Sequence, residues 1–300
     1  MSEKPVVLKS EHLTAEIAPL GAELQRLTDA DGRDLLWDGG AAWWTGRAPL
    51  LFPIVGRLPD DALVHDGVSY PMKQHGFARR RAFTLLSATA SRAIYRLTED
   101  EETLKQYPFP FGLYISYTLL DATLAIEARV HNPGTARLPV SFGFHPAFRW
   151  PLPYGGTPEE HTIRFEKPEV APIHRPVDGL LSRYTEPSPA MGGGITLDDP
   201  ALFERDALIF DQIRSHHVRY GVPGQPGLEI AFAGMPQFAL WSKPGAPFIC
   251  LEPWFGYATP EGDTRPFAEK PGLIQVQPGN EVRFAMQVRW LPDVGRDIGP

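Results

Sequence analysis

Cysteine is almost absent from this chain, because Cys250 is the only one among 300 residues. A single thiol cannot form an internal disulfide or a cysteine-rich metal site, and this favours a reducing compartment. Long apolar runs are missing too, since no stretch approaches the roughly 18 apolar residues of a membrane span. The first twenty residues lack a basic segment followed by an apolar core, so no export signal is expected. We therefore expect a cytoplasmic protein that does not enter a membrane.

Positive charge is also scarce. The chain holds 29 Lys and Arg against 36 Asp and Glu, which gives a net charge of -7. A mildly acidic surface repels phosphate backbones, so nucleic acid is not expected as a partner. The longest basic run is Arg79, Arg80 and Arg81, and it follows closely after His75.

Helical periodicity is rare, whereas an alternation with a period of two runs through the chain. In residues 281–290 the apolar side chains include Phe284, Met286 and Val288, and most residues between them are polar. This pattern predicts a strand with one buried side and one solvent-facing side. Turn signals such as Asp-Gly and Asn-Pro-Gly separate many short runs of this kind. No internal repeat or break in composition divides the chain, so we predict one all-β domain over residues 1–300, a sandwich or a barrel with few short helices.

Three neighbourhoods combine a proton-handling or anion-binding side chain with aromatic residues, glycine and proline. The first joins Phe-Pro-Ile-Val-Gly-Arg at 52–57 to Gln-His-Gly-Phe-Ala-Arg at 74–79. The second is Ser-Phe-Gly-Phe-His-Pro-Ala-Phe at 141–148, and the third is Cys-Leu-Glu-Pro-Trp-Phe-Gly at 250–256. A sugar site needs this mixture, because aromatic faces stack on the C–H faces of a pyranose while a few fixed polar groups bind its hydroxyls.

Each of these features also has an ordinary structural interpretation. A lone histidine among aromatic residues, such as His75 or His145, is more often a packed residue with a satisfied hydrogen bond than a catalyst. Glu252 follows an apolar run, and a glutamate at the end of a strand is usually exposed. Arg57 could equally be an ordinary surface arginine, and Trp254 could be a residue of the hydrophobic core. The functional hypothesis gains weight because all three neighbourhoods occur in one chain.

Taken in order, these motifs resemble those of the aldose 1-epimerase family, and most closely its LacX-like branch. The resemblance begins with Gly-Ala-Glu-Leu at 21–24, continues through Leu-Trp at 36–37 and Trp-Trp at 43–44, and runs to Pro253. It implies a large antiparallel β-sandwich of the galactose mutarotase type, which agrees with the alternating pattern. It also implies an isomerase of carbohydrate metabolism, a mutarotase that needs no metal and no organic cofactor.

Such an enzyme interconverts the α and β anomers of a hexose. It removes a proton from the C1 hydroxyl and delivers one to the ring oxygen O5, so that the C1–O5 bond opens and closes again on the other face. A carboxylate suits the base, and a protonated imidazole suits the acid near neutral pH. On the matching motifs, the resemblance assigns Glu252 as the catalytic base and His145 as the catalytic acid.

The resemblance also implies groups that bind the sugar. His75 and Arg57 correspond to side chains that bond sugar oxygens and steady the charge developing at O5. Asp206 is the candidate for an aspartate that bonds the distal hydroxyls, and Trp254 supplies an aromatic face. Arg79 is expected to border the site, because its forked guanidinium suits sugar hydroxyls or a phosphate.

Several alternatives stay open at this point. The basic run at 79–81 could bind a phosphate, which would make the substrate a hexose 6-phosphate. A non-catalytic carbohydrate-binding protein would carry the same aromatic residues without needing a carboxylate and two histidines. A glycoside hydrolase needs two carboxylates around one bond, and only Glu252 has a marked setting. His216 and His217 are adjacent, so on a strand they point to opposite faces and make a poor metal site.

The partner that these motifs predict is a small-molecule sugar, a hexose or a hexose phosphate. The sequence leaves the choice between a monomer and a homodimer open.

Overall fold

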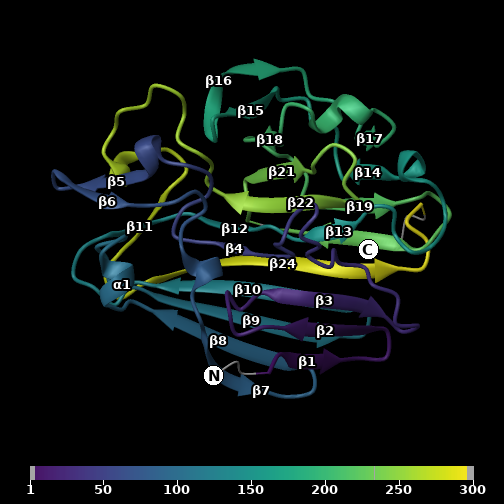
Figure 1. Ribbon diagram of the computed structural model, residues 1–300, viewed down its shortest axis with the longest axis horizontal. Coiled ribbons are helices and arrows are strands. Elements are labelled where there is room, and N and C mark those ends of the chain that lie inside the picture. The colour runs from purple at the N-terminus through teal and green to yellow at the C-terminus, as the bar shows by residue number, and fades with distance from the viewer. Residues whose placement is uncertain (1–3, 233, 296–300) are drawn as a thin grey trace.

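A computed structural model of the chain describes residues 4–232 and 234–295, and within them almost all regular structure is β (Figure 1). The described ranges contain one α-helix, the single turn α1 (Glu101–Leu104). Asp100 caps this helix, because its carboxylate accepts a hydrogen bond from the backbone N–H of Thr103 at 2.8 Å. The prediction of an all-β fold with few short helices is confirmed.

The larger of the two main sheets has nine strands. In spatial order they are β17 (Gly194–Thr196), β14 (Thr162–Phe165), β19 (His217–Gly221), β20 (Gly227–Ala231), β24 (Glu281–Leu291), β10 (Thr123–His131), β9 (Gly112–Leu120), β8 (Arg92–Thr98) and β7 (Thr84–Ala88). β10 pairs antiparallel with β9 and with β24 along its whole length. Every second residue of β10 is buried, as the alternation in the sequence predicts for a sheet covered on one side.

The second main sheet has eight strands and carries the candidate site. In spatial order seven of them are β16 (Leu180–Glu186), β15 (Ile173–Val177), β18 (Leu208–Phe210), β21 (Gln237–Trp241), β22 (Phe248–Phe255), β12 (Phe142–Phe144) and β4 (Leu50–Leu51). The eighth, β13 (Ala147–Arg149), pairs antiparallel with β22 beside β12. β22 therefore lies in the interior of the sheet, and seven of its eight residues are buried.

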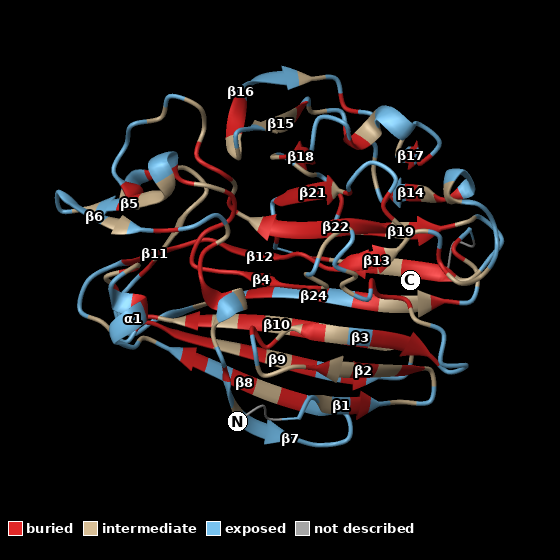
Figure 2. Cartoon of the chain, in the orientation of Figure 1, coloured by how far each residue is buried: buried red, intermediate tan, exposed pale blue. Residues whose placement is uncertain are grey.

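The two main sheets pack face to face over one apolar core, which confirms the predicted antiparallel sandwich. Phe142 of β12 stacks on Phe284 of β24 with 5.2 Å between the ring centroids. The rest of this face of the nine-stranded sheet is covered by a three-stranded sheet of β1 (Val6–Lys9), β2 (Leu13–Ile17) and β3 (Leu24–Asp29). Tyr117 of β9 donates to the carbonyl of Ala22, in the connection between β2 and β3, at 2.6 Å. Figure 2 shows buried residues along the strands of all three sheets.

Smaller elements complete the ends of the sandwich. Two-stranded sheets are formed by β11 (Leu138–Val140) with β23 (Ile274–Val276), and by β5 (Ala62–His65) with β6 (Val68–Pro71). Single 3₁₀ turns occur at Pro59–Asp61, Ala78–Arg80, Pro158–Glu160, Pro200–Phe203 and Phe267–Glu269.

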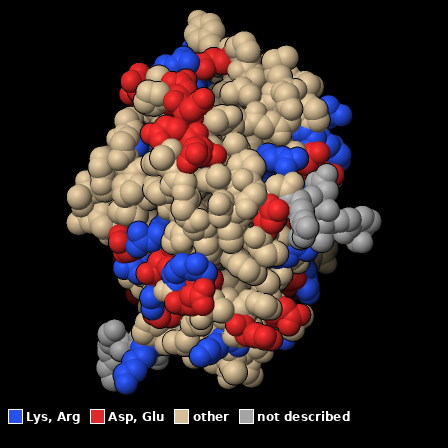
Figure 3. All heavy atoms as spheres, turned by 90° about the vertical axis from the view of Figure 1, so that its right-hand side faces the viewer, with Lys and Arg blue, Asp and Glu red and all other residues tan. Residues whose placement is uncertain are grey.

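Charged side chains of both signs are mixed over the surface that Figure 3 presents. Among the described residues on this face, basic side chains lie next to acidic ones instead of forming a continuous track, which a nucleic acid backbone would need. None of the helices in the described ranges has the length and apolar content that a membrane crossing demands.

Candidate active site

Glu252 occupies the middle of β22, where its backbone pairs with Ala239 of β21. Its side chain is 1% exposed, so it is not the solvent-facing glutamate that most often ends an apolar run. A carboxylate this deeply buried costs folding free energy unless it has a partner or a function.

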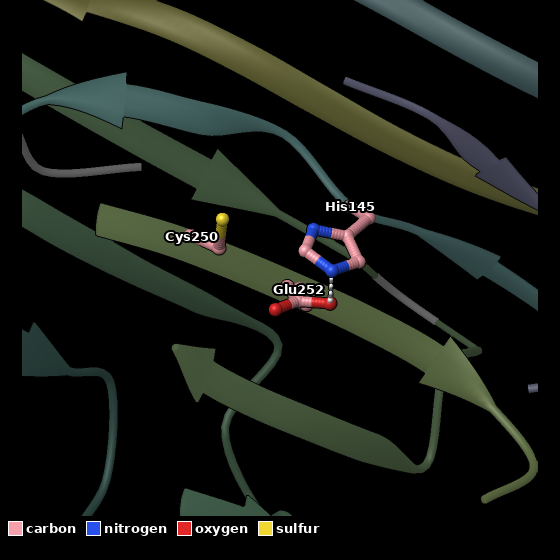
Figure 4. Close-up of side chains that lie close together, drawn as sticks. All are labelled: His145, Cys250 and Glu252. Carbon is pink, nitrogen blue, oxygen red and sulfur yellow. Dashed lines mark ion pairs between the residues drawn. The ribbon is translucent and has the colours of Figure 1, made fainter. Parts of the chain in front are cut away.

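His145 directly follows β12, and its imidazole turns back toward β22 (Figure 4). Its Nε2 lies 3.2 Å from Oε2 of Glu252, and His145 is only 7% exposed. The approach is close but poorly aligned for a hydrogen bond, because Glu252 Oε2 has no hydrogen-bond partner among the described residues. His145 Nδ1, on the other side of the ring, has none among them either. The two groups therefore form a buried acid–base pair with hydrogen-bonding capacity left over for a ligand.

This pair forms one wall of a cavity of about 320 Å³, within the range of about 300–1,000 Å³ that is usual for small-molecule sites. Five ionisable residues line it: His75, Arg79, His145, Asp206 and Glu252. Three tryptophans line it as well: Trp44, Trp241 and Trp254. Of the site residues that the sequence predicts, the structure thus brings six together around one cavity and leaves Arg57 outside its lining.

His75 is locked in place by the turn that carries it. Its backbone N–H donates to Gly56 O at 2.8 Å, and its Nδ1 accepts the backbone N–H of Gly56 at 3.1 Å. Because Nδ1 is an acceptor, the ring proton of neutral His75 sits on Nε2. Burial lowers the pKa of His75 well below 6.5, and His145 and Arg79 add to the effect. His75 is therefore a neutral hydrogen-bond donor in the cavity lining, and its Nε2 lies 3.3 Å from the side-chain amide of Gln74, which lines the same cavity.

Arg57 is absent from the cavity lining. Its Nε lies 2.7 Å from Oδ1 of Asp61, and its Nη1 donates to the carbonyl of Asp178 at 2.8 Å. The sequence motif alone does not show this ion pair with Asp61. The guanidinium is thus engaged by Asp61 and Asp178 beside the cavity.

Arg79 supplies the guanidinium that faces the cavity. Its Nη2 donates to Gln74 O at 3.0 Å, while its buried Nε has no partner among the described residues. Burial and the neighbouring Arg80 lower the pKa of Arg79 to about 10, so the side chain still carries its charge at neutral pH. The other two arginines of the basic run are engaged elsewhere: Arg80 with Gly76 O and Arg81 with Asp100.

Asp206 and Trp254 complete the polar lining. Asp206 accepts the backbone N–H of Ala207 at 2.8 Å, which fixes the direction of its carboxylate. Trp254 lies two residues after Glu252 on β22 and therefore on the same face, and its buried Nε1 has no partner among the described residues. Both side chains can bind hydroxyl groups that enter the cavity.

The electrostatics of the cavity favour a neutral pair. Burial raises the pKa of Glu252 well above its usual 4.5, and the nearby charge of Asp206 adds to this, while the indole N–H of Trp254 acts in the opposite direction. Burial lowers the pKa of His145 from 6.5 to about 3, assisted by the charge of Arg79. Both shifts favour the neutral forms, a protonated carboxyl beside a neutral imidazole, over the imidazolium that the sequence alone leads one to expect.

One group of described residues could hold a metal ion: His145, Cys250 and Glu252, whose ligand atoms all lie within 4.8 Å of one another (Figure 4). Zinc accepts this mixture of ligands. Cys250, however, packs in a buried apolar cluster with Phe248, and burial together with Glu252 raises the pKa of its thiol well above 9. Burial therefore favours the protonated thiol in the metal-free protein.

Two cavity residues were missed by sequence reasoning. Trp44 belongs to the Trp-Trp pair of the resemblance, but nothing in its spacing assigns it a role. Trp241 reads as an ordinary strand residue. Both contact the imidazole of His145, at 5.0 and 5.7 Å between ring centroids. An aromatic pair in a loop that precedes a predicted site motif was the available signal.

Comparison with known proteins places this geometry in a family. The family model described as aldose 1-epimerase matches residues 4–289. The LacX protein of Lactococcus lactis is 33% identical over 285 residues, which cover 91% of this chain and 95% of that protein.

Solved structures agree. A galactose mutarotase related enzyme from Lactobacillus acidophilus superimposes with a TM-score of 0.88 at 27% identity, covering 96% of this chain and 97% of the other. A galactose mutarotase-like protein from Lactobacillus casei gives a TM-score of 0.87 at 26% identity, covering 96% of this chain and all of the other. The resemblance inferred from the motifs is thereby confirmed, and the chain belongs to the aldose 1-epimerase family.

Proposed function

We propose that the protein catalyses mutarotation, the interconversion of the α and β anomers of a free hexose. The observation that supports this most strongly is the buried pair of Glu252 and His145, 3.2 Å apart, in a cavity lined by three tryptophans. An anomer exchange needs one group that accepts a proton and one that donates a proton, both within reach of neighbouring oxygens of the same ring.

In the proposed mechanism, Glu252 accepts the proton of the C1 hydroxyl while His145 donates a proton to O5. The C1–O5 bond then opens, the aldehyde turns about the C1–C2 bond, and the reverse transfers close the ring on its other face. The reactive form is an ion pair, in which the proton that Glu252 holds at rest has moved to His145. The 3.2 Å separation allows this transfer inside the cavity without solvent.

The remaining polar groups are proposed to bind the sugar. His75 and Arg79 can donate to ring and hydroxyl oxygens, and Asp206 can accept from hydroxyls. Trp254 offers both an aromatic surface and its indole N–H. Arg57 has a different proposed part, because its pairing with Asp61 stabilises the loop that carries Gly56 and hence His75.

A hexose 6-phosphate is the second candidate, since Arg79 lines the cavity with a free Nε. A phosphate dianion would, however, meet only this one arginine of the basic run together with the carboxylate of Asp206. The negative charge of Asp206 would repel the phosphate. The lining therefore favours an uncharged hexose.

Polarimetry on freshly dissolved α-D-glucose, α-D-galactose and glucose 6-phosphate tests the proposal, after the spontaneous rate has been subtracted. Glu252→Gln and His145→Asn should each lower kcat by about 10²–10⁴-fold, the usual contribution of a general acid or base. Glu281→Gln and His216→Asn, which change the same residue types outside the cavity, serve as controls.

The outcomes separate the candidates. A wild-type protein that binds sugars yet leaves the spontaneous rate unchanged would be a carbohydrate-binding protein. If Glu252→Gln and His145→Asn turn over as fast as their controls, this pair is not the catalyst.

A further inference from the structure

His145 lacks the hydrogen bond that usually orients a catalytic imidazole. Its Nε2 faces Glu252, while its Nδ1 is buried without a hydrogen-bond partner among the described residues. A histidine that transfers protons ordinarily uses its second ring nitrogen to bond a carbonyl or carboxylate, and this bond sets the orientation of the ring. The orientation of His145 must therefore come from packing.

Aromatic rings provide that packing. The indole of Trp44 stacks on the imidazole, with 5.0 Å between the ring centroids and 29° between the planes. Trp241 and His75 instead meet His145 nearly at right angles, with centroid distances of 5.7 and 5.8 Å. Of these three neighbours, Trp44 is the one that lies face to face with the ring.

We propose that Trp44 is the positioning residue for His145: it holds the imidazole toward Glu252 and stabilises the imidazolium of the reactive ion pair. This inference rests on the proposed function. An aromatic face attracts a cation through its quadrupole, and the attraction grows where water is excluded. The neutral imidazole of the resting state gains less from the same face. The stacking therefore lowers the activation free energy of mutarotation and leaves the affinity for the sugar unchanged.

Trp44 is itself held in place from several directions. Trp37 Nε1 donates to Trp44 O at 2.8 Å, and Trp241 packs edge-on against the indole at 5.3 Å. Gly46 lies directly against the ring, because a Cβ at this position would come within 2.4 Å of Cζ2 of Trp44. A side chain at position 46 must therefore displace the indole, which offers a way to disturb the stacking while keeping the tryptophan.

The test combines three substitutions with two matched controls. Trp44→Leu removes the aromatic face, Trp44→Phe keeps a smaller one, and Gly46→Ala displaces the indole. Trp43→Leu changes the adjacent tryptophan, which does not line the cavity. Gly192→Ala adds a methyl group where nothing lies within 4 Å.

Mutarotation kinetics should show a split between kcat and KM. We expect Trp44→Leu to lower kcat on the order of tenfold, the size of a cation–π contact in a desolvated site, with KM changed by less than about twofold. Gly46→Ala should lower kcat in the same way, Trp44→Phe should recover most of it, and both controls should behave as the wild type. If Trp44→Leu does not fold, as thermal unfolding will reveal, Gly46→Ala and Trp44→Phe carry the test.

Three results would overturn the inference. The first is that Trp44→Leu and Gly46→Ala have the same kcat as the controls. If Trp44→Leu does not fold, the kcat of Gly46→Ala alone decides. The second is a raised KM at unchanged kcat, which would make Trp44 a sugar-binding residue only. The third is an NMR ring-current shift of the His145 ring that stays unchanged in Gly46→Ala. If Trp44 stacks on this ring, the shift should be lost in Gly46→Ala and kept in Gly192→Ala. This NMR comparison does not depend on activity, so it tests the stacking even if the wild type proves not to be a mutarotase.

Discussion

Replacing His145 with Asn should change how the stability of the protein depends on pH. Burial, with the nearby charge of Arg79, lowers the pKa of His145 from 6.5 to about 3 in the folded protein. In the unfolded chain the imidazole has its ordinary pKa of about 6.5. As the pH falls through this value, the unfolded chain takes up a proton that the folded protein does not, so the folded state loses stability toward acid.

The two pKa values set the size of this loss. At pH 5 the unfolded imidazole is almost fully protonated and the folded one almost fully neutral, which lowers the free energy of unfolding by about 2 kcal/mol relative to pH 8. The unfolding entropy near 60 °C is about 2.1 cal/mol/K per residue, so for 300 residues one kcal/mol corresponds to roughly 1.6 °C in Tm. The drop in Tm between pH 8 and pH 5 should therefore be smaller by about 3 °C in His145→Asn than in the wild type.

Scanning calorimetry at pH 8 and pH 5 measures this drop in Tm directly. The comparison uses the difference between pH 8 and pH 5 within each protein, so the packing defect left by the smaller side chain largely cancels. His216→Asn, at an exposed histidine outside the cavity, controls for the loss of a histidine as such. An identical pH dependence in wild type and His145→Asn would refute the neutral resting state of the pair.

Two further predictions concern residues around the cavity. Gly76→Ala should lower the free energy of unfolding by more than about 2 kcal/mol, measured by urea denaturation, because its φ is +69° and a Cβ would lie 2.2 Å from Phe52 O. Arg79→Ala should raise KM for the sugar about tenfold or more, since it removes a charged donor from the cavity. Arg57→Ala should change KM much less, because its guanidinium pairs with Asp61 outside the lining, and equal effects in both variants would contradict this assignment.

The strands of the nine-stranded sheet are predictable from sequence, because the core covers only one side of this sheet. Residues 281–290 alternate because one side of β24 faces the core and the other faces solvent, and the observed strand is Glu281–Leu291. β22 is harder to predict, because its residues are buried on both sides and leave no alternation to read. For this reason Glu252 appeared to close an apolar run, whereas the strand continues to Phe255.

The site depends on contacts between residues far apart in sequence. β12 pairs with β22 through Gly143 and Trp254, and this pairing brings His145 to Glu252 across more than a hundred residues. No local pattern specifies such a pairing, so only the combined resemblance of the motifs could suggest it. The motifs predict both Arg57 and Arg79 at the site, and only Arg79 lines the cavity. The two arginines end similar motifs, and the sequence does not show that Arg57 pairs with Asp61 instead.

A buried pair that holds one proton suits a reaction that must run equally well in both directions. Ring opening moves a proton from O1 to the protein and from the protein to O5, and ring closure reverses both transfers, so the protein needs the same total number of protons before and after. Burial raises the pKa of Glu252 and lowers that of His145, and both shifts favour a single proton on the pair, held by Glu252. Two exposed groups at their ordinary pKa values would hold one proton between them only about a quarter of the time at pH 7, on the imidazole. The desolvated cavity is therefore part of the proposed catalytic device, since burial retains the proton that the pair must transfer.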